Sequence, residues 1–135
     1  MEATDLRLGN LVLRAPSSDY KDWKETTVNL SYLELILQNT NDFKGIPLTA
    51  ELLLDRCGFA QLPHFTILNS LIFDLGRGRF LSVACVGTPN EMLFITDDNK
   101  AVIVLRNYDY DGKTYLHHIQ NFIFALTGTE LTLKP

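Results

Sequence analysis

Four short apolar segments follow one another between residues 71 and 108, and they constrain the fold more than any other feature of the chain. They cover residues 71–75, 80–86, 93–96 and 101–108. Turn-forming residues separate them at 76–79, 87–91 and 97–100, and these connections are too short for a crossover helix. Neighbouring segments should therefore pair directly, which predicts an antiparallel β meander.

The composition of the meander predicts what lies around it. Residues 80–86 and 102–105 are apolar at successive positions, so we expect both faces of the central strands to be covered. A helix from Thr114, as its N-cap, to Thr127, with Gly128 as its stop, provides one cover. Its apolar stripe consists of Leu116, Ile119, Ile123 and Leu126, with Phe122 beside it.

The N-terminal third is richer in β-formers and turns. After Gly9-Asn10, residues up to Arg14 read as a first strand, and residues 26–30 predict a second. Ser31 and Glu34 have capping-box spacing for a helix over 32–37. A clearer helix begins at Thr49 and ends at Gly58, and residues 129–133 are a candidate edge strand.

These elements predict an α+β protein with a single domain over residues 1–135. Residues 1–45 form its small β-rich N-terminal part, and residues 46–135 contain the short helix around 49–57, the meander and the C-terminal helix packed against it. A chain of 135 residues with 46% hydrophobic residues is large enough to bury one core. No linker or internal repeat interrupts it.

Charge and targeting signals limit the classes of partner. The net charge of -4 disfavours nonspecific binding to nucleic acid and to anionic lipid. The acidic start, residues 1–5, lacks the features of a secretory signal, and no apolar stretch is long enough to span a membrane. We expect a cytoplasmic protein with no membrane and no nucleic-acid partner.

The cysteines and histidines do not indicate a metal or cofactor. Cys57 and Cys85 lie in apolar segments and are expected to be buried free thiols. His117 and His118 are adjacent on the predicted helix, so their side chains should diverge by about 100° and should not grip one metal ion. His64 lies in a Pro-His loop without a partner at metal-ligand spacing.

Catalytic motifs are also missing from the sequence. There is no Gly-x-Ser-x-Gly nucleophile motif, and the acidic pairs at 97–98 and 109/111 fall in turns, where aspartate usually caps its own backbone. The chain is therefore expected not to be an enzyme. Convergence of Asp74, Asp109 and His117 in a cleft would instead indicate a hydrolase or nuclease.

The segment Asp74-Leu-Gly-Arg-Gly-Arg79 is the strongest local indication of a binding site. Glycines allow a ligand to approach the backbone, and Arg77 and Arg79 can hold phosphate or carboxylate in bidentate fashion. The segment leads into a strand and lacks the lysine of a phosphate loop. A hairpin turn with solvated arginines therefore stays open as the alternative.

Aromatic side chains supply the other half of the predicted site. Tyr108 and Tyr110 stand between a strand and the helix that carries His117, and their rings suit a nucleobase or a protein partner. A half-buried turn is the alternative interpretation. Trp23, in the polar loop 15–24, is a candidate contact point for a protein.

Three segments of the chain resemble an uncharacterised family of small proteins carried by phages, prophages and mobile elements of Bacteroidetes. They are residues 6–12 (LRLGNLV), residues 46–49 (IPLT) with 57–59 (CGF), and residues 115–128 (YLHHIQNFIFALTG). The resemblance implies a small SH3-like barrel in the N-terminal part, from which the loop 15–24 departs. It also implies a phage accessory protein acting by binding in the host bacterial cytoplasm, in anti-defence.

Two binding hypotheses follow. In the first, the protein sequesters a small anionic nucleotide-like signalling ligand without catalysis, with Arg77 and Arg79 for charge and Tyr108, Tyr110 and His117 for the ring. It requires the turns at 76–79 and 108–113 to come together. In the second, an interaction module binds a host or phage protein through Trp23 and a sheet edge. Either could act as a homo-oligomer.

Overall fold

The computed structural model describes residues 5–17, 21–38, 40–61, 70–97 and 100–135. It divides into two compact units. The N-terminal unit contains residues 1–46 and 115–122, and the meander unit contains residues 47–114 and 123–135. The single domain and its expected division between residues 45 and 46 stay predictions. His64, residues 1–4, the loop tip 18–20, Asn39 and the turn residues 98–99 lie outside the described residues.

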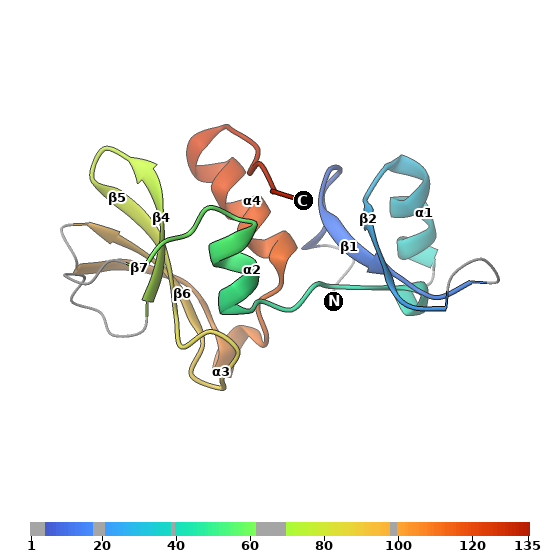
Figure 1. Ribbon diagram of the computed structural model, residues 1–135, viewed down its shortest axis with the longest axis horizontal. Coiled ribbons are helices and arrows are strands. Elements are labelled where there is room, and N and C mark those ends of the chain that lie inside the picture. The colour runs from blue at the N-terminus through green and yellow to red at the C-terminus, as the bar shows by residue number, and fades with distance from the viewer. Residues whose placement is uncertain (1–4, 18–20, 39, 62–69, 98–99) are drawn as a thin grey trace. The chain divides into compact units, whose positions relative to one another are not determined.

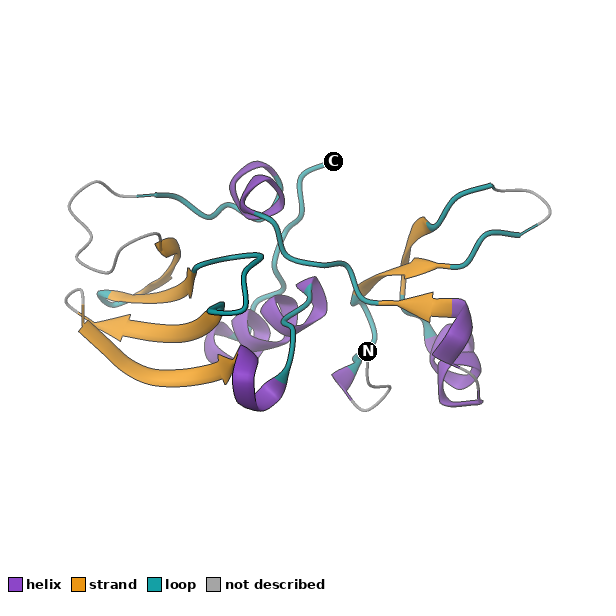
Figure 2. Ribbon diagram, turned by 90° about the horizontal axis from the view of Figure 1, so that it is seen from below, coloured by secondary structure: helices purple, strands orange, loops and turns teal. Residues whose placement is uncertain are grey.

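The meander unit contains a four-stranded antiparallel sheet, in the order β4-β5-β6-β7 (Figures 1 and 2). Its strands are β4 (Ser70–Gly76), β5 (Arg79–Ala84), β6 (Met92–Asp97) and β7 (Lys100–Asn107). Each strand pairs with the next along the chain, and this confirms the predicted meander.

Burial across this sheet follows strand position. Successive residues of β5 and β6 are buried, as in Leu81 and Ser82, so both faces of these central strands are covered as predicted. The same expectation was wrong for Ile103 and Val104 in the segment 102–105. Ile103 and Val104 are 53% and 52% exposed, because β7 is the last strand of the described sheet order.

Helix α2 (Ala50–Asp55) forms as its capping residues predict. The Thr49 side chain accepts a hydrogen bond from the Leu52 N–H at 3.0 Å, and Gly58 follows the helix with a φ of 77°. The ring of Phe59, just after the helix, packs on Phe73 of β4 with centroids 5.5 Å apart. This contact attaches the end of α2 to the sheet.

Helix α4 (Leu116–Thr127) begins later than predicted and ends as predicted at Gly128, whose φ is 72°. Thr114 is not its N-cap. Instead, the Tyr115 N–H donates to Nδ1 of His118 at 2.9 Å, so a side chain of the first turn satisfies the helix start. The second half of α4 lies beside the four-stranded sheet, as expected of the C-terminal helix (Figure 1).

Two details of the C-terminal region differ from expectation. In the predicted stripe of α4, Leu116, Ile119 and Ile123 are buried but Leu126 is 44% exposed. Residues 129–133 form no strand. The C-terminal tail is instead hydrogen-bonded to Arg56, the residue that follows α2. The Lys134 N–H donates to the Arg56 carbonyl at 3.0 Å, and the Arg56 Nε donates to the Lys134 carbonyl at 2.9 Å.

The N-terminal unit contains a three-stranded antiparallel sheet in the order β2-β1-β3 (Figure 2). Its elements are β1 (Leu11–Arg14), β2 (Lys24–Thr27), α1 (Leu30–Gln38), the 3-10 turn η2 (Thr40–Asp42) and β3 (Phe43–Lys44). The first strand follows the Gly9-Asn10 turn as predicted. Val12, Val28, Ile36 and Phe43 form its buried apolar cluster. As described, the sheet has three strands and does not show the SH3-like barrel that the resemblance implies.

The predicted boundary between the second strand and the first helix was wrong. The strand covers 24–27 and not 26–30, and the helix starts at Leu30. The Asn29 side chain accepts from the Tyr32 N–H at 2.8 Å, so Asn29 caps the helix in place of Ser31. Pairing of Arg14 with Lys24 fixes the earlier strand position.

Both cysteines are free, as predicted, but only Cys57 is buried, whereas Cys85 is half-buried. Burial raises the pKa of the Cys57 thiol to about 11, against a smaller opposing effect of Arg56. Cys57 is therefore a packing residue. Among the described residues, none of the helices has the length and apolar character needed to cross a membrane.

Candidate functional site

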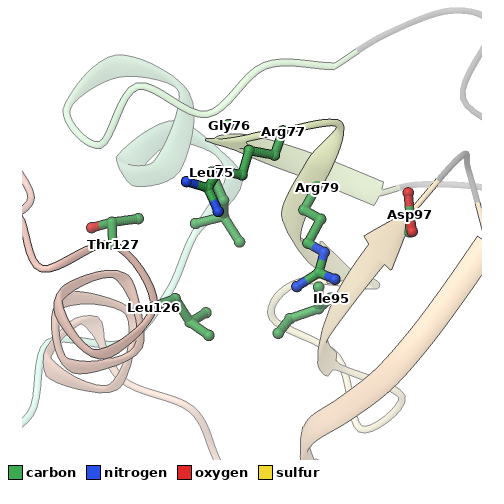
Figure 3. Close-up of a pocket in the computed structure, with 8 residues that line it drawn as sticks. All are labelled: Leu75, Gly76, Arg77, Arg79, Ile95, Asp97, Leu126 and Thr127. Atoms are coloured by element: carbon green, nitrogen blue, oxygen red, sulfur yellow. The ribbon is translucent and has the colours of Figure 1, made fainter.

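A cavity of about 650 Å³ lies in the meander unit, between the β4–β5 hairpin, β6 and the end of α4 (Figure 3). Its lining residues are Leu75, Gly76, Arg77, Arg79, Ile95, Asp97, Leu126 and Thr127. This volume is within the range of small-molecule sites. Two further cavities, in the N-terminal unit, measure about 130 and 180 Å³ and are below that range.

The hairpin turn that carries the arginines has an unusual backbone. Arg77 and Gly78 have φ values of 57° and 74°, so both central residues are left-handed, as in a type I′ turn. Glycine adopts this conformation freely, whereas a residue with a Cβ is disfavoured by about 1 kcal/mol. Asp74 fixes the approach to the turn, because its Oδ1 accepts from the Gly76 N–H at 2.7 Å.

The two arginines approach the cavity from the same turn. Figure 3 shows the Arg79 guanidinium over Ile95 and the Arg77 side chain extending toward the side of Thr127. Both side chains are exposed, and neither makes an ion pair or hydrogen bond with another described residue. Two such guanidinium groups can hold a phosphate or carboxylate through charge-assisted hydrogen bonds.

Apolar side chains form the rest of the wall. Ile95 is buried, Leu75 is half-buried and Leu126 is 44% exposed, which explains why the last leucine of the α4 stripe does not complete the core. A site with apolar walls and a few convergent polar groups is the usual composition of a ligand pocket. The arrangement is suited to bind an anion that carries an apolar or flat body.

The structure does not bring the predicted tyrosines to this cavity. Arg79, Asp97 and Lys100 form one end of the sheet, here called the cavity end, and Ala84, Met92 and Asn107 form the other, the loop end. Tyr108 follows Asn107 directly and so lies at the loop end. Met92 and Asp97, at the two ends of β6, are five residue steps apart, which is about 17 Å at about 3.4 Å per step.

The predicted convergence of the turns at 76–79 and 108–113 was therefore wrong. In a meander, the chain reverses direction at each turn, so the first and third turns share one end of the sheet. The fourth strand then ends at the opposite side. Residues 108–111 form a short helix, α3 (Tyr108–Asp111), in which the Tyr110 side chain is 89% exposed.

His117 is the third aromatic member of the predicted site, and the structure places it elsewhere. It belongs to the N-terminal unit and its side chain is fully buried. Its ring stacks on Tyr115, with centroids 5.7 Å apart and planes 11° from parallel. The buried, stacked ring does not line the cavity, so the structure gives His117 no place in this candidate site.

One group of metal-ligating residues occurs among the described residues: Asp5, His117 and His118, with candidate ligand atoms within 4.8 Å of one another. The two histidine rings lie 4.3 Å apart, so the expectation that they diverge was wrong. The tautomer of His118 nevertheless opposes a metal site. Its Nδ1 accepts from the Tyr115 N–H, so the proton is on Nε2, 3.3 Å from Asp5 Oδ2.

A metal bound at Nε2 of His118 would require the proton to move to Nδ1, because metal-bound histidine donates from its other nitrogen. That proton would face the Tyr115 N–H, which already donates to the same atom. We therefore assign Asp5 and His118 a structural role, and the expected absence of a bound metal stays a prediction.

The same region reveals a polar network that the sequence did not indicate. Residues 5–11 are hydrogen-bonded to α4: Asn10 and Arg7 donate to Asn121 Oδ1 at 2.8 and 3.2 Å, and the Leu11 N–H donates to Gln120 at 2.9 Å. Asn10 and Gln120 are buried. These side chains are expected to hold the N-terminal segment on the helix and to leave little capacity for a ligand.

The hydrolase alternative required Asp74, Asp109 and His117 to converge in a cleft, and the structure does not bring the two aspartates together. Asp74 lies near the cavity end, Asp109 lies in α3 at the loop end, and His117 is buried in the N-terminal unit. Asp74 and Asp109, which both belong to the meander unit, therefore do not meet in one cleft. Asp97, Ile95 and Leu126 line the cavity but were not predicted, because the register that brings them there depends on the irregular loop between β5 and β6.

Comparisons with known proteins add no further assignment to this geometry. Neither the family models, nor the curated proteins, nor the solved structures include one that matches the chain.

Proposed function

We propose that the protein is a non-catalytic binding protein that captures a small anionic nucleotide-like ligand in the cavity of the meander unit. The observation that supports this most strongly is the pair of guanidinium groups, Arg77 and Arg79, at a cavity of about 650 Å³. Their charge is not neutralised by ion pairs within the described residues. An anionic group of a ligand would supply those partners.

The proposal retains the arginines of the original hypothesis and replaces its aromatic half. In place of Tyr108, Tyr110 and His117, the apolar surface of Leu75, Ile95 and Leu126 would contact the body of the ligand. Sequestration of a signalling nucleotide by a phage accessory protein in anti-defence fits such a site and stays a prediction, as do the cytoplasmic location and a homo-oligomeric state.

Isothermal titration calorimetry against a panel of linear and cyclic nucleotides tests the proposal directly. We expect heat of binding for at least one nucleotide in the wild-type protein, and a loss of affinity of at least tenfold in Arg79→Ala. Lys113→Ala is the matched control, since it removes an exposed cation outside the cavity-lining residues. Equal binding by both variants, or no binding by the wild type, would contradict the proposal.

A second candidate function is binding of a protein partner through the N-terminal unit. Leu30, Leu35 and Leu37 of α1 are 64%, 47% and 65% exposed, an unusual apolar content for the surface of one short helix. Trp23 is also exposed, and the Lys44 amino group lies 4.2 Å from its ring centroid. Replacing Leu30 and Leu37 by serine would abolish such binding and leave nucleotide binding unchanged.

A further inference from the structure

Arg79 and Asp97 stand directly opposite each other on β5 and β6. Oppositely charged residues at directly opposed positions are close enough to pair, with Cβ atoms about 5 Å apart. Neither side chain, however, makes an ion pair with another described residue. Figure 3 shows the Arg79 guanidinium directed over Ile95 while the Asp97 carboxylate lies apart from it. The cavity therefore carries both charges separately.

The carboxylate limits the ligands that fit. Two arginines and one aspartate give the lining a net formal charge of +1. A ligand that is only an anion, such as inorganic phosphate, would gain from the arginines and be repelled by Asp97. A ligand with an anionic group at one end and hydrogen-bond donors at the other would satisfy both.

Asp97 is the acceptor left available to such donors among the side chains that line the cavity. The other side chain with an acceptor is Thr127. Its hydroxyl already donates to the Ile123 carbonyl at 2.6 Å and accepts from the Thr129 N–H at 3.1 Å. The Thr127 hydroxyl therefore already has its hydrogen-bond partners at the end of α4. A donor group of the ligand would bind Asp97 instead.

A ribonucleotide has the required arrangement of groups. Its phosphate and its ribose hydroxyls lie at opposite ends of one sugar, and a carboxylate that accepts from ribose hydroxyls is a common device of nucleotide sites. Resting on the proposed function, we propose that Asp97 is the specificity-determining residue of this site: it selects ligands that carry a free ribose diol, while Arg77 and Arg79 hold the phosphate.

The test compares adenosine 5′-monophosphate, its 2′,3′-dideoxy analogue and inorganic phosphate by calorimetry on the wild type, Asp97→Ala and Asp97→Asn. We expect the wild type to prefer the ribonucleotide over the dideoxy analogue by about tenfold, as for loss of a hydrogen bond to a charged group. In Asp97→Ala this ratio should fall to about one, with an intermediate ratio in Asp97→Asn. Inorganic phosphate should bind more weakly than the ribonucleotide to the wild type.

The outcomes separate this inference from the proposed function. Equal affinity of the wild type for the two nucleotides, with both affinities reduced in Arg79→Ala, would overturn the role of Asp97 and leave the anion site in place. An unchanged preference in Asp97→Ala would overturn it as well. No binding of any of the three probes would overturn both. Asp109→Asn, which alters an exposed aspartate outside the cavity lining, is the matched control and should keep the wild-type preference.

Discussion

The charged side chains that line the cavity differ in their partners from those at the loop end of the four-stranded sheet. At the loop end, the buried Glu91 accepts from the N–H groups of Gly87 at 2.7 Å and Thr114 at 3.4 Å. Arg106 donates to Thr114 Oγ1 and to the Asp111 and Lys113 carbonyls. At the cavity end, the arginines of the hairpin and Asp97 have no such partners among the described residues.

This difference distinguishes structural charges from charges available for binding. A charged group that is bonded to its own backbone stabilises loops and has little capacity for a ligand. A charged group beside a cavity without an internal partner can bind one at a lower desolvation cost. The loop end therefore holds the connection between β7 and α4, and the cavity end is the candidate binding site.

The largest effect is expected from Glu91→Ala at the loop end. Removing the carboxylate leaves two backbone N–H groups without their acceptor, so the free energy of unfolding should fall by about 2 to 3 kcal/mol. Urea denaturation of the purified variant measures it. Glu91→Gln keeps one carbonyl acceptor, so its free energy of unfolding should fall by less. A change below about 0.5 kcal/mol in Glu91→Ala would show that the carboxylate does not stabilise the loops.

Arg79→Ala at the cavity end should have the opposite profile. Loss of a charge-assisted contact should weaken nucleotide binding by about tenfold to a hundredfold, while stability should change by less than about 0.5 kcal/mol. Calorimetric titration and urea denaturation of one preparation give both values. If stability falls as much as in Glu91→Ala, Arg79 would belong with the structural charges and the comparison would fail.

A comparison of Arg77→Gly with Arg77→Ala should show how much the left-handed backbone at this position lowers stability, because both variants lack the guanidinium group. Glycine relieves the left-handed strain at φ 57°, so we expect the variant to be more stable than the Arg77→Ala variant, which keeps the strain, by about 1 kcal/mol. Both variants should bind nucleotide more weakly than the wild type. Equal urea midpoints for the two variants would argue against strain at this position.

The sequence predicted the meander well because short turns fix which strands pair, and Thr49 and Gly128 correctly marked helix ends. Asn29 and Ser31 are both good capping residues, and the pairing of β2 with β1 decided between them, which a local pattern does not contain. The cavity depended on register. The register of β5 against β6 places Asp97 opposite Arg79, and it is set across a loop for which the sequence offers no spacing rule.

The topology of the predicted meander already excluded the convergence of the turns at 76–79 and 108–113. Four antiparallel strands place the first turn and the end of the last strand at opposite ends, so Arg77 and Tyr108 were separated by the topology itself. Local composition favoured both segments as ligand sites, and only the first lies at the cavity.

Tyr110→Ala should have the smallest effect and tests that separation. The side chain is 89% exposed at the loop end, so its loss should change stability by less than about 0.5 kcal/mol and leave nucleotide affinity within twofold of the wild type. Calorimetric titration, run in parallel with Arg79→Ala, measures the nucleotide affinity of this variant. A tenfold loss of affinity would mean that the ligand reaches both ends of the sheet or binds at α3, and the division between structural and binding ends would have to be abandoned.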